Sequence, residues 1–485
     1  MDLRDAGLFR ELCHVGGEWV GADDGGVMEV TDPADGRIIG SVPAMTGIEA
    51  ARAVDAALKA LEPWRSSSPA ERSTALSRWG QIMMENIEDL ALIMTMEQGK
   101  PLAESRGEIA YAAGFLDWFS AEARRAYGDT LQAPAGGKWI LVLKQPVGVA
   151  AAITPWNFPS AMITRKAGAA LAAGCSMVVR PASSTPFSAL ALCELAERAG
   201  IPPGVFNVVT GPADAVGGTL VRDPRVRKIS FTGSTEVGSR LMALAAGDVK
   251  RVSLELGGNA PFIVFDDADI QRAVDNAVAS KYRNTGQTCV CTNRFLVQDG
   301  IHEEFLEKLC SAVAGLRVGR GTDPGVQQGP LMDTAAVEKV RRHIADAVDK
   351  GARILMGGGP HELGGNFFQP TVLADVTPDM EIAMEETFGP VSAVMRFGTE
   401  GEALAMANDT RYGLAAYVHT RDLGRAWRCA GALEYGMVGI NEGVISDPAA
   451  PFGGVKSSGS GREGSRYGMD EYMEIKYVCL GGLRE

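Results

Sequence analysis

The stretch from residue 147 to residue 255 constrains the fold of this chain more than any other. Short apolar segments with strand character alternate there with longer segments of helical character. The strand-like segments span residues 147–153, 177–179, 206–209, 226–231 and 252–256, and the helical ones span residues 161–173, 187–199, 213–221 and 235–246. Strict alternation of this kind predicts right-handed βαβ units and a parallel sheet that is covered by helices on both faces.

A second alternating block starts at Pro261. A strand is expected at residues 262–265, and a helix at 270–281 follows acidic residues that favour a helix N-terminus. Further strands are expected at residues 353–356, 391–397 and 415–419. This pattern predicts a second α/β domain. Ahead of the first block, residues 47–61 and 69–127 have a mostly helical pattern.

Two strand-like segments, residues 139–143 and 474–480, lie outside both blocks. Exposed strand edges are a liability in a monomer, because they invite pairing with another chain. We therefore expect the two segments to pair and to support assembly into a homodimer or homotetramer. The alternative is an ordinary hairpin at the edge of the molecule.

Composition excludes several classes of partner. A chain of 485 residues is long enough for two or three domains. The net charge of −13 and the absence of a basic run argue against nucleic acid. The N-terminus lacks an apolar secretory segment, and the apolar stretch 167–179 is too short to cross a bilayer, so we expect a cytoplasmic protein with no membrane partner. Eight scattered cysteines indicate reduced thiols, and the five histidines show no zinc-ligand spacing, so no metal site is expected.

Cys289 and Glu255 are the first candidates for chemistry. Cys289 lies in the segment Gly286-Gln287-Thr288-Cys289-Val290-Cys291, and Glu255 in Glu255-Leu256-Gly257-Gly258. A thiolate can attack a carbonyl carbon, and a carboxylate can take a proton from the water that releases the resulting thioester. The alternative is that Cys289 is a small buried residue and that Glu255 is a solvated surface charge.

Two further segments follow strands of the first block, where open α/β sheets bind their ligands. In Pro155-Trp156-Asn157-Phe158-Pro159, the Asn157 amide could donate to a developing oxyanion, although an asparagine between prolines is also common in turns. The segment 231–238 carries Gly233 and Gly238 at a strand-to-helix junction, where a helix N-terminus favours a diphosphate. Its glycine spacing is weak evidence without that setting.

The order of the motifs resembles the aldehyde dehydrogenase superfamily over nearly the whole chain. The motifs are Pro155-Trp156-Asn157, Phe231-Thr232-Gly233-Ser234, Leu254-Glu255-Leu256-Gly257-Gly258, Gly286-Gln287-Thr288-Cys289, Glu386-Thr387-Phe388-Gly389-Pro390 and Pro451-Phe452-Gly453-Gly454-Val455-Lys456. Within the superfamily, residues 158–166, 281–286 and 461–468 are most similar to the succinate-semialdehyde dehydrogenases.

The resemblance implies an aldehyde dehydrogenase-like α/β fold. It has a Rossmann-type dinucleotide-binding domain, an α/β catalytic domain that carries the nucleophilic cysteine, and a small β arm for oligomerisation. We assign residues 1–127 and 147–258 to the first, residues 259–458 to the second, and residues 128–146 and 470–485 to the arm.

The resemblance also implies a mechanism. Cys289 would attack the aldehyde, Asn157 and the backbone N–H of Cys289 would hold the oxyanion, and Glu255 would activate the hydrolytic water. Lys166 lies in the position that supports this site in the family. Glu386 would bind the nicotinamide ribose, and Phe388 would pack near the nicotinamide. The remaining cofactor-binding residues would be Thr154, Pro155, Trp156, Gly233, Ser234, Gly238 and Leu256.

The expected substrate is a small aldehyde with a remote carboxylate. The resemblance places Arg165, Arg283 and Ser446 at that carboxylate, and two guanidinium groups suit it through charge-assisted hydrogen bonds. Succinate semialdehyde is the expected substrate, and glutarate and 2-oxoglutarate semialdehydes are alternatives. A catalytically silent relative is the alternative from another class, but the loss of cysteine or glutamate that would mark it is not seen.

Cofactor choice depends on Arg180 and Ser183. The family usually has lysine at the position of Arg180, and NAD-preferring relatives often have glutamate at that of Ser183. The guanidinium fork suits a 2′-phosphate, and a hydroxyl does not repel it as a carboxylate would. We expect a preference for NADP, with NAD also possible.

Cys291 is a candidate for redox regulation with Cys289. The resemblance includes relatives in which this pair forms a disulfide, and a nearby second thiol can trap an oxidised nucleophile. The alternative is that Cys291 is a small buried residue that never meets Cys289.

Overall fold

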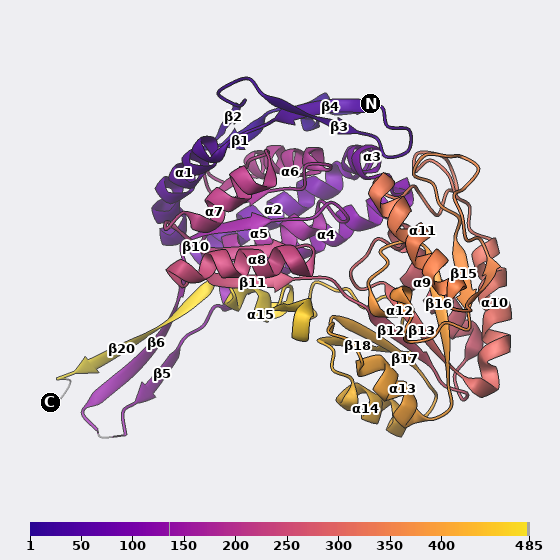
Figure 1. Cartoon of the computed structure of the whole chain (residues 1–485). Helices are drawn as coiled ribbons and strands as arrows, with labels where there is room; N and C mark the ends of the chain where they lie inside the picture. Colours follow the sequence, from indigo (N-terminus) through magenta and orange to yellow (C-terminus); the bar gives the residue numbers. More distant parts are fainter. Residues whose placement is uncertain (135, 483–485) are drawn as a thin grey trace.

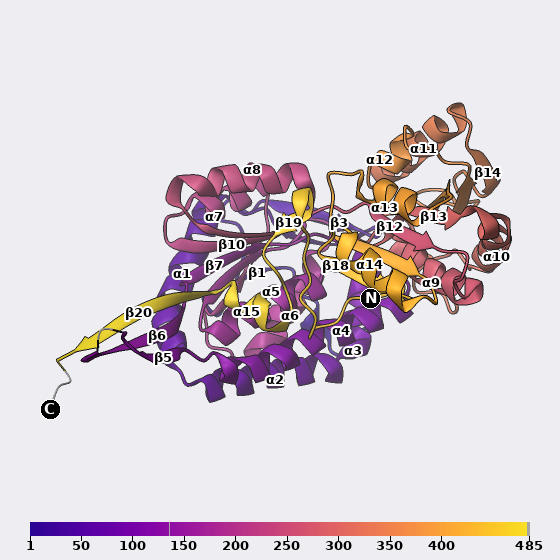
Figure 2. The same cartoon turned by 90° about the horizontal axis from the view of Figure 1, so that it is seen from below.

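The computed structural model describes residues 1–134 and 136–482. It contains two α/β bodies and a β arm that projects from the first body in both views (Figures 1 and 2). The fold class predicted from the sequence is confirmed. None of the helices in the described ranges is long and apolar enough to cross a membrane.

The first body is built on an eight-stranded sheet. From one edge to the other its strands are β19 (Gly459–Ser460), β11 (Arg251–Glu255), β10 (Val226–Thr232), β7 (Val149–Ile153), β8 (Ser176–Arg180), β9 (Phe206–Val208), β1 (Cys13–Val15) and β2 (Glu18–Val20). The five central strands are parallel, as the alternating pattern predicted, whereas β19, β1 and β2 extend the sheet with antiparallel pairs. The parallel part of the sheet starts at β7, continues through β8 and β9 on one side, and then crosses to β10 and β11 on the other side. The strand order therefore reverses between β7 and β10, which is where sheets of this kind bind ligands.

Helices cover both faces of this sheet, which lies between α8 and α2 in Figure 2. They are α1 (Gly47–Ser66), α2 (Pro69–Glu85), α3 (Ile87–Gln98), α4 (Leu102–Glu122), α5 (Ala161–Ala173), α6 (Pro186–Arg198), α7 (Gly218–Arg222) and α8 (Thr235–Ala245). The strand β7 shows why both faces are apolar. Its residues Val149, Ala151 and Ile153 pack on the side of α1, α7 and α8, while Ala150 and Ala152 pack on the side of α2, α4, α5 and α6.

The second body is built on a seven-stranded sheet with a mostly parallel arrangement. Its strands in order are β14 (Arg353–Met356), β15 (Thr371–Ala374), β16 (Val391–Phe397), β13 (Thr292–Gln298), β12 (Ala260–Val264), β17 (Ala415–His419) and β18 (Met437–Ile440). Its helices are α9 (Ile270–Tyr282), α10 (His302–Ala314), α11 (Thr334–Asp349), α12 (Glu381–Met384), α13 (Glu400–Asn408) and α14 (Leu423–Ala432). The second α/β domain that the sequence predicted is thus present, with β14 as an antiparallel edge.

The arm is a three-stranded antiparallel sheet. The strands are β5 (Asp129–Gln132), β6 (Lys138–Pro146) and β20 (Met473–Gly481), and β6 pairs with β20 from Pro146 and Met473 outward. Pairing of the two isolated strand segments is therefore confirmed. The short helix α15 (Ser465–Asp470) leads into β20. The domain boundaries and the role of the arm in assembly stay predictions.

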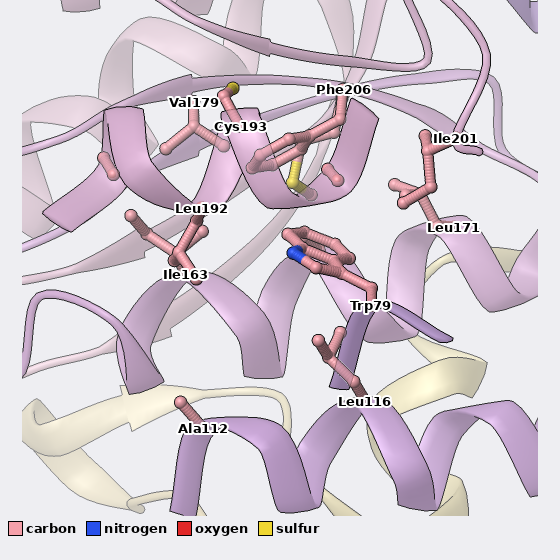
Figure 3. Close-up of a cluster of buried hydrophobic side chains, with 14 of the residues drawn as sticks. Trp79, Ala112, Leu116, Ile163, Leu171, Val179, Leu192, Cys193, Ile201 and Phe206 are labelled. Atoms are coloured by element: carbon pink, nitrogen blue, oxygen red, sulfur yellow. The ribbon is translucent and has the colours of Figure 1, made fainter. Parts of the chain in front are cut away.

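The core of the first body is centred on Trp79 of α2 (Figure 3). The Trp79 side chain is fully buried, and its ring lies 5.1 Å from the ring of Phe206. Leu116 of α4 and Ile163 of α5 belong to the same cluster. Because α5 also carries Arg165 and Lys166, which the sequence predicted as site residues, packing in this cluster helps to fix the position of both.

Replacing Trp79 by alanine should lower the free energy of unfolding by about 3–5 kcal/mol, because a large cavity would remain. Urea unfolding followed by circular dichroism measures the change. Trp427→Ala is the matched control: its side chain is 81% exposed, and the change should stay within about 0.5 kcal/mol. An equal loss in both variants would contradict the central role of Trp79.

Candidate active site

Three predicted residues come together where the two bodies meet. Asn157 follows β7, Glu255 ends β11, and Cys289 lies in the loop between α9 and β13. Two cavities reach this point, one of about 280 Å³ and one of about 370 Å³, and Cys289 contributes to the lining of both. A single thiol therefore faces two separate binding spaces.

The smaller cavity contains the residues predicted to bind the substrate carboxylate. Arg165, Arg283 and Ser446 all line it, together with Tyr111 and Phe452. These residues come from α5, the Cys289 loop, the segment after β18 and α4. The cavity thus combines cationic and hydroxyl groups with apolar walls.

The two arginines of this cavity keep donor atoms free. Arg165 is buried, forms an ion pair with Glu463, and lies 4.4 Å from the Phe452 ring centre. Among the described residues, its Nη2 has no hydrogen-bond partner, and neither has Nε of Arg283. A buried donor without a partner is costly, so an anionic ligand here would gain charge-assisted hydrogen bonds.

The larger cavity contains most of the predicted cofactor residues. Pro155, Trp156, Gly233, Ser234, Leu256, Glu386 and Phe388 line it. Ser234 caps the N-terminus of α8, where an anion is favoured. Trp156 and Phe388 form an edge-to-face pair with ring centres 5.6 Å apart, and burial raises the pKa of Glu386 to about 7.

Two predicted cofactor residues, Thr154 and Gly238, lie behind this cavity and do not line it. The backbone N–H of Thr154 donates to the carbonyl of Arg180. A Cβ at Gly238 would collide with the side chain of Leu256, which does line the cavity. Gly238 therefore allows α8 to approach Leu256.

The larger cavity as a whole combines the anion-favouring N-terminus of α8, two aromatic rings and the carboxyl group of Glu386. This combination fits a nicotinamide dinucleotide.

Arg180 and Ser183 lie outside both cavities. Nη2 of Arg180 donates to Oγ of Ser183 at 2.8 Å and to the carbonyl of Gly211 at 3.0 Å. Its Nε is buried and has no partner among the described residues. The two predicted determinants of cofactor choice are therefore in direct contact.

The loop before Cys289 has a strained backbone. Asn284, Thr285 and Gly286 have φ angles of +50°, +59° and +75° in succession. Non-glycine residues rarely adopt such values, and each costs of order 1–3 kcal/mol unless its surroundings hold it. A Cβ at Gly286 would collide with the Gly389 carbonyl, which explains the glycine of this motif.

Asn157 is buried beside this loop. Its Nδ2 donates to the carbonyl of Gln287 at 3.1 Å. An amide nitrogen carries two hydrogens, so one remains for another acceptor. Burial raises the pKa of Cys289 to about 12, so the resting group is a neutral thiol.

Glu255 has a fully buried carboxyl group, and neither of its oxygens has a hydrogen-bond partner among the described residues. Burial, followed by the nearby charge of Glu463, raises its pKa well above the ordinary value. A buried carboxyl group with a raised pKa binds a proton more readily than an exposed one, so it can accept and return a proton during a reaction.

Glu463 is a functional residue that sequence reasoning missed. It pairs with Arg165 and with Lys166, whose Nζ also donates to Thr232 at 2.7 Å. Burial alone would raise the pKa of Glu463, but the two cations outweigh it and hold the pKa below its ordinary value. The motif 461–468 contained the residue, but its partners lie about 300 positions away and are not visible in the sequence.

Cys291 lies close to Cys289 in sequence, but its thiol is engaged elsewhere. Its Sγ lies 3.4 Å from the carbonyls of Lys281 and Thr292. All eight cysteines lie in the described part of the chain and are free. The predicted disulfide stays a prediction. Within the same ranges, no group of three or more His, Cys, Asp or Glu residues is arranged to hold a metal ion.

Comparisons with known proteins agree with this geometry. The model of the aldehyde dehydrogenase family matches residues 19–478. The glutarate-semialdehyde dehydrogenase of Pseudomonas aeruginosa is 62% identical over 483 residues, which are 100% of both chains. The succinate-semialdehyde dehydrogenase (NADP(+)) of Escherichia coli is 60% identical over 99% of this chain and 100% of its own.

A solved structure described as an E. coli NADP dependent enzyme has a TM-score of 0.98 at 59% identity. The match covers 99% of this chain and 100% of that one. With a buried thiol between two cavities and a family match over nearly its whole length, the chain belongs to the aldehyde dehydrogenase family and is an oxidoreductase.

Proposed function

We propose that this protein oxidises succinate semialdehyde, or a similarly short semialdehyde with a distal carboxylate, to the dicarboxylic acid, with NADP preferred over NAD. The observation that carries the proposal is the position of Cys289 between two cavities, one of which also contains Arg165 and Arg283. Relatives named for succinate and glutarate semialdehydes support the substrate class.

The thiol of Cys289 first loses its proton to water, and the thiolate then attacks the aldehyde carbon to form the anion of a thiohemiacetal. The free N–H of the Asn157 amide and the backbone N–H of Cys289 stabilise the oxyanion, and one such donor contributes roughly 3 kcal/mol. Glu386, Trp156 and Phe388 would hold a nicotinamide cofactor in the larger cavity, and that cofactor would supply the acceptor for the hydride. Loss of the hydride leaves the acyl group on Cys289 as a thioester.

Glu255 then takes a proton from the water that hydrolyses the thioester. Its carboxyl group has no competing hydrogen bond among the described residues, so water can become its partner. Lys166 and Glu463 form a buried ion pair near it, and the charge of Glu463 helps to raise the pKa of Glu255.

The arm supports assembly into a homodimer or homotetramer. Its strands expose Trp139, Ile475 and Tyr477, with 43%, 73% and 63% of each residue accessible. A second copy would cover these side chains and the free strand edges. Eight free cysteines support a reducing, cytoplasmic location. A reversible Cys289–Cys291 disulfide stays part of the proposal.

Arg283→Ala should raise KM for succinate semialdehyde about 10- to 100-fold, because a charged hydrogen bond contributes about 1.5–3 kcal/mol. KM for butanal should change less than about twofold, since butanal makes no such bond. Initial rates with each aldehyde measure both values. Arg341→Ala, at an exposed position on α11, is the control. Equal effects on both aldehydes would assign Arg283 a structural role.

Glu255→Gln should leave the first turnover fast and make later turnovers slow, so that reduced cofactor appears as a burst. Because the pKa of Glu255 is raised, its base form grows as the pH increases, and the steady-state rate of the unmodified protein should rise with pH through this titration. The variant should lose that dependence. Stopped-flow absorbance at several pH values tests this, and an unchanged pH profile would exclude Glu255 as the base.

Arg180→Glu should lower kcat/KM with NADP by about 10-fold or more, because a carboxylate repels a 2′-phosphate that the guanidinium binds. The loss with NAD should be smaller. Ser183→Ala, which keeps the charge of Arg180, is the control and should shift the ratio much less. A wide preference of the unmodified protein for NAD would refute the argument from both residues.

A further inference from the structure

A buried ion pair in the wall of the smaller cavity has no role in the chemistry above. Lys100, in the turn between α3 and α4, and Glu108 of α4 each have side chains that are 1% exposed, and Nζ lies 2.6 Å from Oε2. Burying two charges is expensive, and apolar residues of similar size are often as good for stability. The pair therefore calls for an explanation other than stability.

The remaining hydrogen bonds of the pair all go to the segment that carries Asn157. Nζ of Lys100 donates to the carbonyl of Asn157 at 2.6 Å. Oε1 of Glu108 accepts the backbone N–H groups of Ser160 at 2.9 Å and Ala161 at 3.2 Å. The two charged groups thus hold both ends of residues 157–161, which connect β7 to α5.

The other side of Asn157 is fixed by the Cys289 loop. Nδ2 of Asn284 donates to the Asn157 carbonyl at 2.9 Å, and Gln98 donates to Oδ1 of Asn284 at 2.9 Å. The Asn157 amide donates to the carbonyl of Gln287. The carbonyl of Asn157 therefore accepts from two buried donors, one cationic, and its side chain has one defined orientation.

We infer that Lys100, held by Glu108, is a positioning residue for the oxyanion site. It fixes the backbone of Asn157 so that the second amide hydrogen points to the oxygen of the attacked aldehyde. The inference rests on the proposed oxyanion role of Asn157. Lys100 and Glu108 belong to the wall of the smaller cavity, but Nζ of Lys100 is bonded to Glu108 and to the carbonyl of Asn157. Because misplacement of a catalytic group by 1 Å can cost about 100-fold in rate, loss of Lys100 should act mainly on the chemical step.

A double-mutant cycle tests this, with the burst rate of reduced cofactor in stopped flow as the readout. Lys100→Met should lower that rate about 10- to 100-fold, and Asn157→Ala about 100- to 1,000-fold. In the Asn157→Ala background, Lys100→Met should have no further effect, because the amide that it positions is gone. KM for the semialdehyde and Kd for the cofactor should stay within about twofold in Lys100→Met, because Lys100 lines the smaller cavity with its Nζ already bonded to Glu108 and Asn157. A large rise in KM with an unchanged burst rate would instead make Lys100 a substrate-binding residue and would overturn the inference.

Lys250→Met is the matched control. Lys250 also has a buried side chain, a carboxylate partner and bonds to two backbone carbonyls. It lies just before β11, at the opposite end of that strand from Glu255. The burst rate of Lys250→Met should match that of the unmodified protein. Where Lys100→Met fails to fold, Lys100→Met/Glu108→Gln replaces it in the cycle, because the carboxamide oxygen can still accept from Ser160 and Ala161 and no charge is left unpaired.

The outcomes separate this inference from the function on which it rests. A full burst rate in Asn157→Ala would overturn the oxyanion assignment and this inference together. A slow Asn157→Ala with the same fold loss from Lys100→Met in both backgrounds would overturn this inference alone, because a structural role costs rate whether or not the amide is present.

Discussion

The arrangement of the active site depends on the carboxylate of Glu463, which lies buried between Arg165 and Lys166. Two adjacent cations on α5 are fully buried, and neither could remain charged there without a partner. The partner comes from the C-terminal segment, which returns from the second body and adds β19 to the first sheet. This cluster of ion pairs therefore joins the C-terminal segment to α5, and its charges shift the pKa of Glu255.

The topology of the first sheet brings the catalytic segments to one edge. At the carboxyl ends of neighbouring parallel strands, Ile153 is in register with Arg180 and Phe231. One residue further along, Thr232 is in register with Glu255. The loops that follow them therefore face the second body, where the Cys289 loop enters. Close contact requires small residues at the meeting points: a Cβ at Gly258 would collide with the carbonyl of Cys289.

Helices and strands could be predicted from the sequence where a local pattern of apolar residues and turn residues marks their bounds. The helix Ala161–Ala173 and the strand Val391–Phe397 were predicted with their observed bounds, since each has a long apolar run between clear turn signals. The strands before residue 47 and β13, β15 and β18 were missed. The strands β15 and β18 have only four residues each, which is too few to show a period, and β13 begins with the polar residues Thr292, Asn293 and Arg294. Asn157, Glu255 and Cys289 were found from motifs, whereas Glu463 and Lys100 were not, because their roles exist only through partners distant in the chain.

The shared position of Cys289 has a consequence for how such a protein can change over evolutionary time. Of the residues that the structure describes, Cys289 alone belongs to the linings of both cavities. A substitution at any other lining residue therefore changes a side chain of one cavity only. Aldehyde range and dinucleotide preference can drift as two independent traits, while the thiol between them, which serves both partners, has no freedom to vary.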